Sequence, residues 1–174
     1  MAVRSFALAF ACVALAASVC LVPAAAPVHA QADKQDKGAK LPRFASLRSG
    51  EVNVRTGPGA RYPVDWVFKR QNMPVEILAE YDTWREVRDW QGTKGWVHQA
   101  MLTAQRNIMV TGDAAQALLR KAEDGAQPVA KAEPGVIALL RRCEMEWCLI
   151  QIDRVSGWVR RKSIWGVYTD EDVK

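Results

Sequence analysis

The chain has 174 residues, of which 49% are apolar, 25% charged and 8% aromatic. This is the composition of a globular protein, and it excludes a disordered, collagen-like or polytopic membrane protein. Lysine and arginine number 24 and aspartate and glutamate 19, so the net charge is +5. Such a mild positive excess does not by itself indicate nucleic-acid binding. The length allows one domain or two small ones.

The first thirty residues have the pattern of a secretory signal peptide. Arg4 precedes an apolar run of 17 residues that begins at Phe6 and is broken by Pro23. Val28-His29-Ala30 then places small residues where a signal peptidase reads the chain. We predict a signal peptide at residues 1–30, cleaved after Ala30, and a periplasmic or secreted protein with no stable membrane insertion afterwards. The alternative, an uncleaved anchor, would need about 20 apolar residues.

Residues 31–43 alternate in charge and contain almost no large apolar side chain. Such a segment cannot bury enough apolar surface to order itself. We therefore predict a flexible linker between the signal peptide and the folded part of the chain.

From Phe44 onward, short alternating segments are separated by turn residues. Val52–Arg55 has the period-two pattern of a half-buried strand, and Gly57-Pro58-Gly59 forms a tight turn after it. Further strands are predicted at Val64–Phe68, Pro74–Leu78, Trp84–Asp89 and Trp96-Val97. Five short strands at about ten-residue spacing predict a small barrel or sandwich.

The same pattern occurs a second time, which defines an internal repeat. Two matches preserve the tryptophans: Gly95-Trp96-Val97 corresponds to Gly157-Trp158-Val159, and Trp84 to Trp147. Two others align with each other without a gap: Arg55 corresponds to Arg120, and Pro63-Val64 to Pro128-Val129. The repeat predicts a first module at residues 44–103, a second module at 104–168 and an acidic tail at 169–174.

One segment of the second module conflicts with this alignment. Ala114–Ala122 is rich in alanine and leucine and would pass as a helix on propensity alone. The alignment instead makes Ala117–Arg120 the counterpart of Val52–Arg55. We predict a strand there, because strand formation overrides a weak local propensity.

The sequence VNVRTGPG at residues 52–59, followed by a tryptophan and then by GWV, resembles the bacterial SH3 family. The resemblance covers about residues 44–168, although the second copy has Ala122-Glu123-Asp124 in place of Gly57-Pro58-Gly59. It implies an all-β protein of two tandem small SH3-like β-barrels, each strongly bent and built from about five strands. It also implies modules that bind cell-wall peptides, cell-wall glycans or other proteins and that are usually not enzymes.

The residues give little sign of catalysis or metal binding. His98 is the single histidine after residue 30, and we expect it to be exposed or to cap a turn. Cys143 and Cys148 are five residues apart with no second ligand pair, which is not zinc-finger spacing. We predict no catalytic site, no metal site and no cofactor.

Cys143 and Cys148 are predicted to form a disulfide. Their flanks have the pattern of two hairpin arms joined by the loop Glu144–Trp147, so the two cysteines would face each other across the ladder. Counting back from the matched tryptophans places Glu80 and Arg85 at the same positions of the first copy. Two free, half-buried thiols are the alternative.

Aromatic residues found in only one copy suggest a binding surface. Tyr62 and Trp66 follow the Gly-Pro-Gly turn, whereas the alignment places Gln127 and Lys131 there in the second copy. We hypothesise a shallow groove of Tyr62, Trp66 and Trp84, because flat aromatic surface suits short peptides and sugar rings. The alternative is that Trp66 packs against the other module.

Several other residues have two interpretations. Arg55 either bonds carbonyls of the turn or clamps a peptide carboxylate. Trp96 and Trp158 are interpreted as core, whereas Trp84 and Trp147 lie on the outer face unless a bulge re-aims them. Two basic clusters are present, Arg141-Arg142 and Arg160-Arg161-Lys162. They either form a solvated face or attract the protein to an anionic wall or membrane, and salt would weaken that attraction.

The sequence thus predicts an exported, non-catalytic protein that recognises peptidoglycan, by its stem peptide or its glycan, through Tyr62, Trp66, Trp84 and Arg55. The alternative is a protein–protein adaptor that docks on an envelope protein. We expect no nucleic-acid partner, because export places the protein in the wrong compartment.

Overall fold

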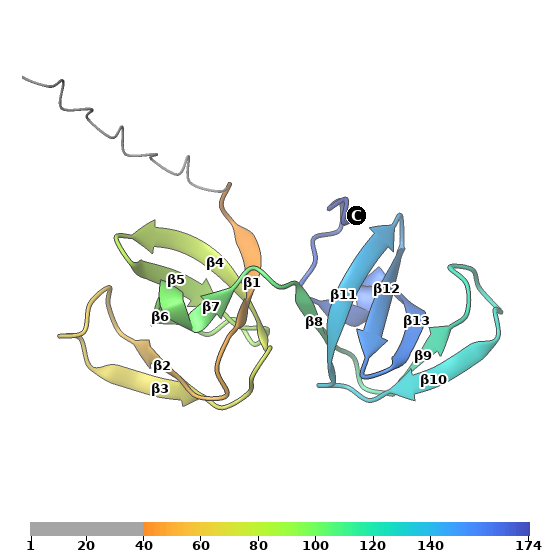
Figure 1. Ribbon diagram of the computed structural model, residues 1–174, viewed down its shortest axis with the longest axis horizontal. Coiled ribbons are helices and arrows are strands. Elements are labelled where there is room, and N and C mark those ends of the chain that lie inside the picture. Colours follow the sequence, from red (N-terminus) through yellow and green to blue (C-terminus); the bar gives the residue numbers. More distant parts are fainter. Residues whose placement is uncertain (1–39) are drawn as a thin grey trace, which may run out of the picture. The chain divides into compact units, whose positions relative to one another are not determined.

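The computed structural model describes residues 40–174. The predicted signal peptide and most of the predicted linker lie outside these residues, so cleavage after Ala30 and the resulting location stay predictions. The described part of the chain forms two seven-stranded sheets, one after the other along the sequence (Figure 1).

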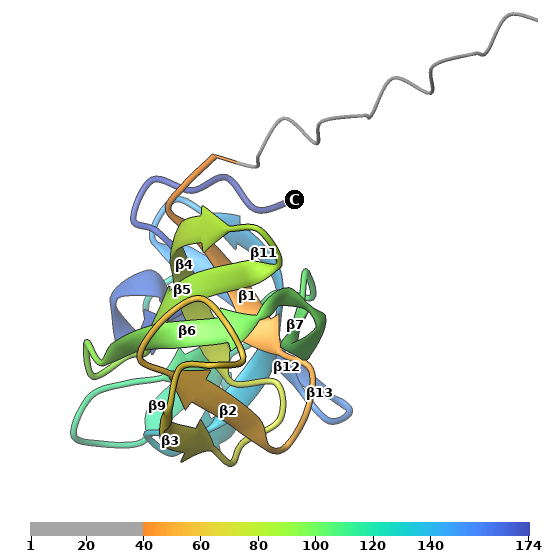
Figure 2. The same cartoon turned by 90° about the vertical axis from the view of Figure 1, so that its left-hand side faces the viewer.

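The first sheet contains all the strands predicted for the first module and two more. Its strands are β1 (Arg43–Leu47), β2 (Val52–Arg55), β3 (Val64–Phe68), β4 (Pro74–Tyr81), β5 (Trp84–Arg88), β6 (Lys94–His98) and β7 (Leu102–Thr103). Their order in the sheet is β3-β2-β6-β5-β4-β1-β7. A single 3-10 turn, Gln99–Met101, separates β6 from β7. Figure 2 shows this sheet bending from β4, β5 and β6 round to β2 and β3.

The second sheet repeats the first strand by strand. Its strands are β8 (Asn107–Val110), β9 (Gln116–Leu119), β10 (Pro128–Ala132), β11 (Ile137–Glu144), β12 (Trp147–Ile152), β13 (Val155–Arg160) and β14 (Ile164–Trp165). Their order, β10-β9-β13-β12-β11-β8-β14, is that of the first sheet, and a 3-10 turn at Arg161–Ser163 again precedes the last strand. The prediction of two tandem all-β modules is confirmed. β9 also confirms that the alanine-rich segment forms a strand.

Each sheet wraps round an apolar core, and the first core also includes Met109 of β8. The first core includes Leu47, Val54, Val87 and Val97, and the second includes Ile108, Leu118, Ile150 and Val159. In both copies the second strand contributes a fully buried side chain, Val54 or Leu118. Burying these side chains is the main favourable term in the folding of each barrel.

The predicted alignment of the two copies is wrong by one residue in the second strand. Arg55 pairs with Trp96, whereas Leu119 pairs with Trp158. Leu119 is therefore the counterpart of Arg55, and Arg120 is not. The prediction aligned the two arginines because they are the same type of residue. The fold instead aligns residues of the same burial, because a shift of one residue along a strand would turn every side chain to the opposite face.

The corrected alignment changes the partners of the two aromatic residues near the turn. Thr56 N–H donates to the carbonyl of Pro63, and Arg120 N–H to that of Gln127, so residue 63 corresponds to residue 127. Trp66 pairs with Val54 as Ala130 pairs with Leu118. The counterpart of Tyr62 is therefore Ala126 rather than Gln127, and that of Trp66 is Ala130 rather than Lys131. The two aromatic residues still occur in the first copy alone.

The predicted disulfide is confirmed. Cys143 on β11 faces Cys148 on β12, and the two are bonded. The connecting turn has two residues, Met145 and Glu146, instead of the predicted four, because Glu144 pairs with Trp147 and both belong to the strands. In the first barrel Glu80 faces Arg85 at the same place, and the two form an ion pair of 3.2 Å.

The residues after β14 are held by hydrogen bonds and ion pairs. The carbonyl of Val173 accepts a hydrogen bond of 2.9 Å from Cys143 N–H, and Glu171 pairs with Arg106. Burial opposes ionisation of Glu171, but the hydrogen bonds from Arg106 and Tyr168 and the charges of Arg106 and Arg161 outweigh it and lower the pKa of Glu171. The predicted acidic tail therefore contributes a fixed carboxylate to the fold.

Candidate ligand-binding surfaces

One hollow lies on the outer face of the first barrel, where strands β2, β6 and β5 adjoin. Arg55 lies opposite Trp96, and Trp84 lies opposite His98, so these side chains share the face that points away from Val54 and Val97. The hollow has a volume of about 340 Å³ and is lined by Glu51, Asn53, Arg55, Trp84, His98 and Met101. We call it the Arg55–Trp84 hollow.

Arg55 is fixed in this hollow by the turn that follows β2. Its Nη1 donates to the carbonyls of Ala60 at 3.2 Å and Tyr62 at 2.7 Å, as the structural interpretation expected. Its Nε and Nη2 make no hydrogen bond with the described residues. These two atoms form the edge of the guanidinium that can bind a carboxylate through two parallel hydrogen bonds.

Trp84 and His98 form the aromatic side of the hollow. Their rings make an edge-to-face contact with centroids 5.4 Å apart. His98 Nδ1 accepts a hydrogen bond of 3.2 Å from Ala100 N–H and so caps the 3-10 turn, which confirms the expected capping role. Trp84 is half-buried, and its register places it on the outer face without a bulge in its own strand.

The interpretation of the GWV tryptophans as core is wrong for Trp96. It is half-buried on the outer face, and the glycine and valine beside it face inward. Trp158 is buried but lies outside the second apolar core, with the guanidinium of Arg142 at 5.1 Å over its ring. These tryptophans cover the outside of the sheet.

Trp66 and Tyr62 lie elsewhere on the first barrel. Trp66 packs against the first core and against Phe68, with ring centroids 5.8 Å apart. It lines a second hollow together with Trp90. Tyr62 packs on Gly57, where an added Cβ would lie 2.5 Å from the Tyr62 ring and would displace it. The structure thus brings Arg55 and Trp84 together, but it places Trp66 on a different hollow and Tyr62 on neither.

The predicted single groove of three aromatic residues therefore does not form, although Tyr62 and Trp66 are only half-buried. Sequence reasoning also missed Trp90 and Asp89, which line the second hollow. The signal that selected Trp66, an aromatic residue found in one copy alone, would have found Trp90, which corresponds to Asp153. It would not have found Asp89, which is not aromatic.

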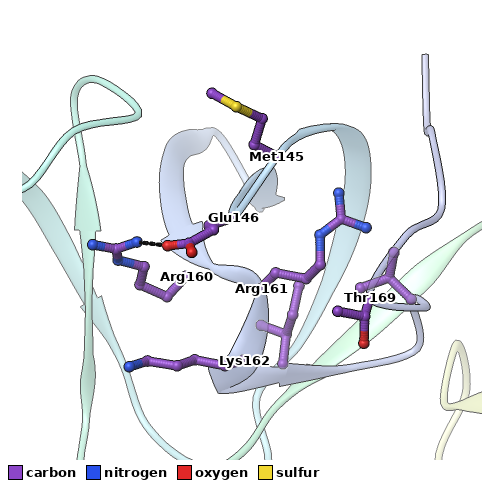
Figure 3. Close-up of a pocket in the computed structure, with 8 residues that line it drawn as sticks. Met145, Glu146, Arg160, Arg161, Lys162 and Thr169 are labelled. Atoms are coloured by element: carbon purple, nitrogen blue, oxygen red, sulfur yellow. Dashed lines mark hydrogen bonds and ion pairs between the residues drawn. The ribbon is translucent and has the colours of Figure 1, made fainter.

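The second barrel covers the surface that corresponds to the Arg55–Trp84 hollow. Arg160 takes the place of His98, and its guanidinium lies 4.2 Å over the ring of Trp147, which is only 8% exposed. Ion pairs with Asp124 and Glu146 hold Arg160 there. Figure 3 shows Arg160 reaching Glu146 in a hollow of about 380 Å³, with Arg161 extending away from that pair.

The basic clusters are largely engaged by contacts within the protein. Arg161 Nη1 donates to the carbonyls of Tyr168 at 2.6 Å and Glu171 at 2.9 Å. Arg141 binds the side chain of Gln151 at 2.9 Å, and Arg142 pairs with Glu144 at 3.3 Å. These contacts support the interpretation of the clusters as a solvated surface.

Within residues 40–174, no three His, Cys, Asp or Glu side chains are grouped so that they could hold a metal ion. The same part of the chain contains no helix of the length and hydropathy needed to cross a membrane.

Two successive barrels with one strand order define a protein of tandem SH3-like modules. The family model described as bacterial SH3 domain matches residues 48–103 and 112–166. The chain belongs to the bacterial SH3 domain family, whose domains are typically binding modules.

Two solved structures from Trichomonas vaginalis are similar to the chain. NlpC2 is 9% identical, with a TM-score of 0.35 over 77% of this chain and 51% of that one. NlpC1 is 10% identical, with a TM-score of 0.34 over 73% of this chain and 46% of that one. The chain thus spans about half the length of these two proteins. No match was found among curated proteins.

Proposed function

We propose that the protein is an exported, non-catalytic binding protein that recognises the stem peptide of peptidoglycan in the Arg55–Trp84 hollow. The observation that carries this proposal is the free Nε–Nη2 edge of Arg55 beside the half-buried ring of Trp84 on one face of the barrel. Bacterial SH3 domains are binding modules, and the resemblance noted above includes cell-wall peptides among their ligands.

The lining of the hollow suits a short peptide with charged ends. The free edge of Arg55 would take a carboxylate in two parallel hydrogen bonds. Glu51 is exposed on the same hollow and would attract an amino group. The ring of Trp84 offers flat apolar surface to small side chains and has few rotamers to immobilise. A sugar ring would offer hydroxyls to Arg55 and Glu51 but no opposite charge, whereas a peptide with charged ends would offer both.

The comparison of the two copies favours binding by the first barrel alone. At the corresponding place in the second barrel, Arg160 covers Trp147 and is neutralised by two carboxylates. Leu119 replaces Arg55, so the second barrel also lacks the guanidinium. A ligand at that surface would have to displace two ion pairs.

The proposal is tested by sedimentation with insoluble cell-wall sacculi. We expect the purified protein to pellet with the sacculi. The amount of the Trp84→Ala variant left in the supernatant should be at least five times that of the unaltered protein. Tyr81→Ala is the matched control, because Tyr81 is 62% exposed on the same barrel but does not line the hollow. Circular dichroism would verify that both variants are folded.

A protein that stays in the supernatant at low salt would overturn the proposal. So would a Trp84→Ala variant that pellets like the unaltered protein when soluble cell-wall glycan fragments are present in excess to block binding through the sugar chains. Cross-linking of the unbound protein to a second envelope protein would then favour the adaptor role.

A further inference from the structure

A second hollow on the first barrel shares no lining residue with the Arg55–Trp84 hollow. It has a volume of about 350 Å³, and its walls include Trp66, Trp90, Asp89, Gln91, Thr93 and Lys69. The volume is at the lower end of the range of about 300–1,000 Å³ for small-ligand sites. We propose that this Trp66–Trp90 hollow binds one pyranose ring of a polysaccharide.

The two tryptophans give the hollow its apolar surface. Trp90 lies between β5 and β6 and is 47% exposed, so much of its ring is open to solvent and to a ligand. Trp66 is half-buried beside it, and its Nε1 is buried without a hydrogen-bond partner in the described part of the chain. An unsatisfied buried donor is costly, and an acceptor brought by a ligand would relieve that cost after a small shift of the ring.

Asp89 supplies a rigid acceptor next to the tryptophans. It is 6% exposed, and its Oδ1 accepts hydrogen bonds from Gln91 N–H at 2.9 Å and Thr93 N–H at 2.8 Å. Its Oδ2 makes no hydrogen bond within residues 40–174. The turn therefore holds the carboxylate in place and leaves one oxygen for a ligand, so little conformational entropy would be lost on binding.

This arrangement fits a pyranose better than a proline-rich peptide. A pyranose ring has a flat C–H face for an indole and a rim of hydroxyls that both donate and accept hydrogen bonds. The hollow offers the acceptor Asp89 and the donor Lys69 around its aromatic surface, and Lys69 is exposed. A proline-rich peptide lacks side-chain hydroxyls and would leave the carboxylate of Asp89 without a donor.

The fold itself does not require these residues. Val87 pairs with Gly95 as Ile150 pairs with Gly157, so Asp89 corresponds to Ile152 and Trp90 to Asp153. Trp66 corresponds to Ala130. The second barrel forms the same sheet without any of the three side chains, so their presence in the first copy is better explained by a ligand.

The inference is tested with two soluble probes, the β-1,4-linked tetramers of N-acetylglucosamine and of glucose. Isothermal titration calorimetry on the intact protein should detect binding of at least one tetramer, and Trp90→Ala should weaken it about threefold to tenfold. Trp66→Phe keeps the aromatic ring but removes the Nε1 donor and should weaken binding to a smaller extent. Tyr81→Ala, another exposed aromatic truncation, should bind like the unaltered protein.

Absence of binding by both tetramers at millimolar concentration would overturn the inference, as would equal binding by Trp90→Ala. Trp90-dependent binding of a proline-rich peptide in place of the sugars would overturn it as well. The inference does not depend on recognition of the stem peptide: Trp84→Ala should retain tetramer binding even if the sacculus experiment fails.

Discussion

The disulfide of the second barrel makes a quantitative test of the fold possible, because the first barrel has an ion pair at the same place. Replacing both Cys143 and Cys148 by alanine removes the bond. Alanine is preferred to serine, since Cys148 is fully buried and Cys143 is 5% exposed, so a hydroxyl would lack solvent there. Any loss of stability then reports mainly the cross-link.

The expected loss follows from the length of the closed loop. The cysteines are five positions apart, so about six residues are enclosed, and chain entropy gives a stabilisation of about 2.2 kcal/mol at 25 °C. Unfolding of roughly 135 residues has an entropy of about 280 cal/mol/K. The double variant should therefore melt about 8 °C lower if both barrels unfold in one transition. If they unfold separately, only the transition of the second barrel should move, by about twice as much.

The matched control is the double replacement of Glu80 and Arg85 by alanine. Their side chains are 25% and 14% exposed, and the ion pair between them is 3.2 Å long. The replacement also removes the ion pair of Glu80 with Arg43 and the hydrogen bonds of Arg85 to Asp82, Trp84 and Gln99. Such partly exposed pairs contribute about 0–1 kcal/mol, and salt weakens them. We expect a decrease in melting temperature below about 4 °C that shrinks further in high salt. The effect of the cysteine replacement should not depend on salt.

The assay is differential scanning calorimetry without reductant, together with thiol titration of the denatured, unreduced protein. The titration should find no free thiol. Two free thiols, or a cysteine variant that melts within 2 °C of the unaltered protein, would refute the reasoning. An equal decrease in the two variants would show that the cross-link contributes no more than the contacts of Glu80 and Arg85 at the same place.

Two further predictions concern stability. In Gly95→Ala the added Cβ would lie 2.3 Å from Val54 Cγ1 and 3.2 Å from the carbonyl oxygen of Arg55. We therefore expect urea denaturation to show a destabilisation of about 1–3 kcal/mol. An unchanged denaturation midpoint would contradict the close approach of β6 to β2. The pKa of Glu171 is lowered from 4.5 in the folded protein, so its contribution is present above pH 4.5 and is lost as the pH falls through the folded value. Glu171→Gln should therefore melt lower than the unaltered protein at pH 7 and lose less stability between pH 5 and pH 3; parallel melting curves across that range would contradict the role of Arg106.

The strands that could be predicted are those with one buried face. β2 alternates between buried and exposed residues, and its pattern marks a half-buried strand. β1 was missed because four of its five residues are buried in succession, so it shows no alternation, and it starts at Arg43 within the predicted linker. β7 has only two residues, too few for any period to be visible.

The composition of the candidate site was harder to predict than the fold. Arg55 and Trp84 lie on strands that are not neighbours, and they meet on one surface because β6 lies between β2 and β5. That adjacency depends on which strands pair, and no local spacing encodes it. Trp66 has no aromatic counterpart in the second copy, but its strand position turns it toward the core and away from Trp84.

The two copies show how one sheet can form either an open or a closed outer surface. In each barrel a tryptophan begins the fifth strand and faces the residue that ends the sixth strand, His98 in the first copy and Arg160 in the second. His98 contacts Trp84 by its edge and uses Nδ1 to cap the turn. No ion pair within residues 40–174 holds it across the tryptophan. Arg160 is longer and is held across Trp147 by two carboxylates, Asp124 from the loop after β9 and Glu146 from the disulfide-linked hairpin. The disulfide fixes the hairpin that carries Glu146, and Glu146 in turn holds Arg160 over Trp147. The second barrel, to which we assign no ligand, therefore has both the cross-linked hairpin and the covered tryptophan.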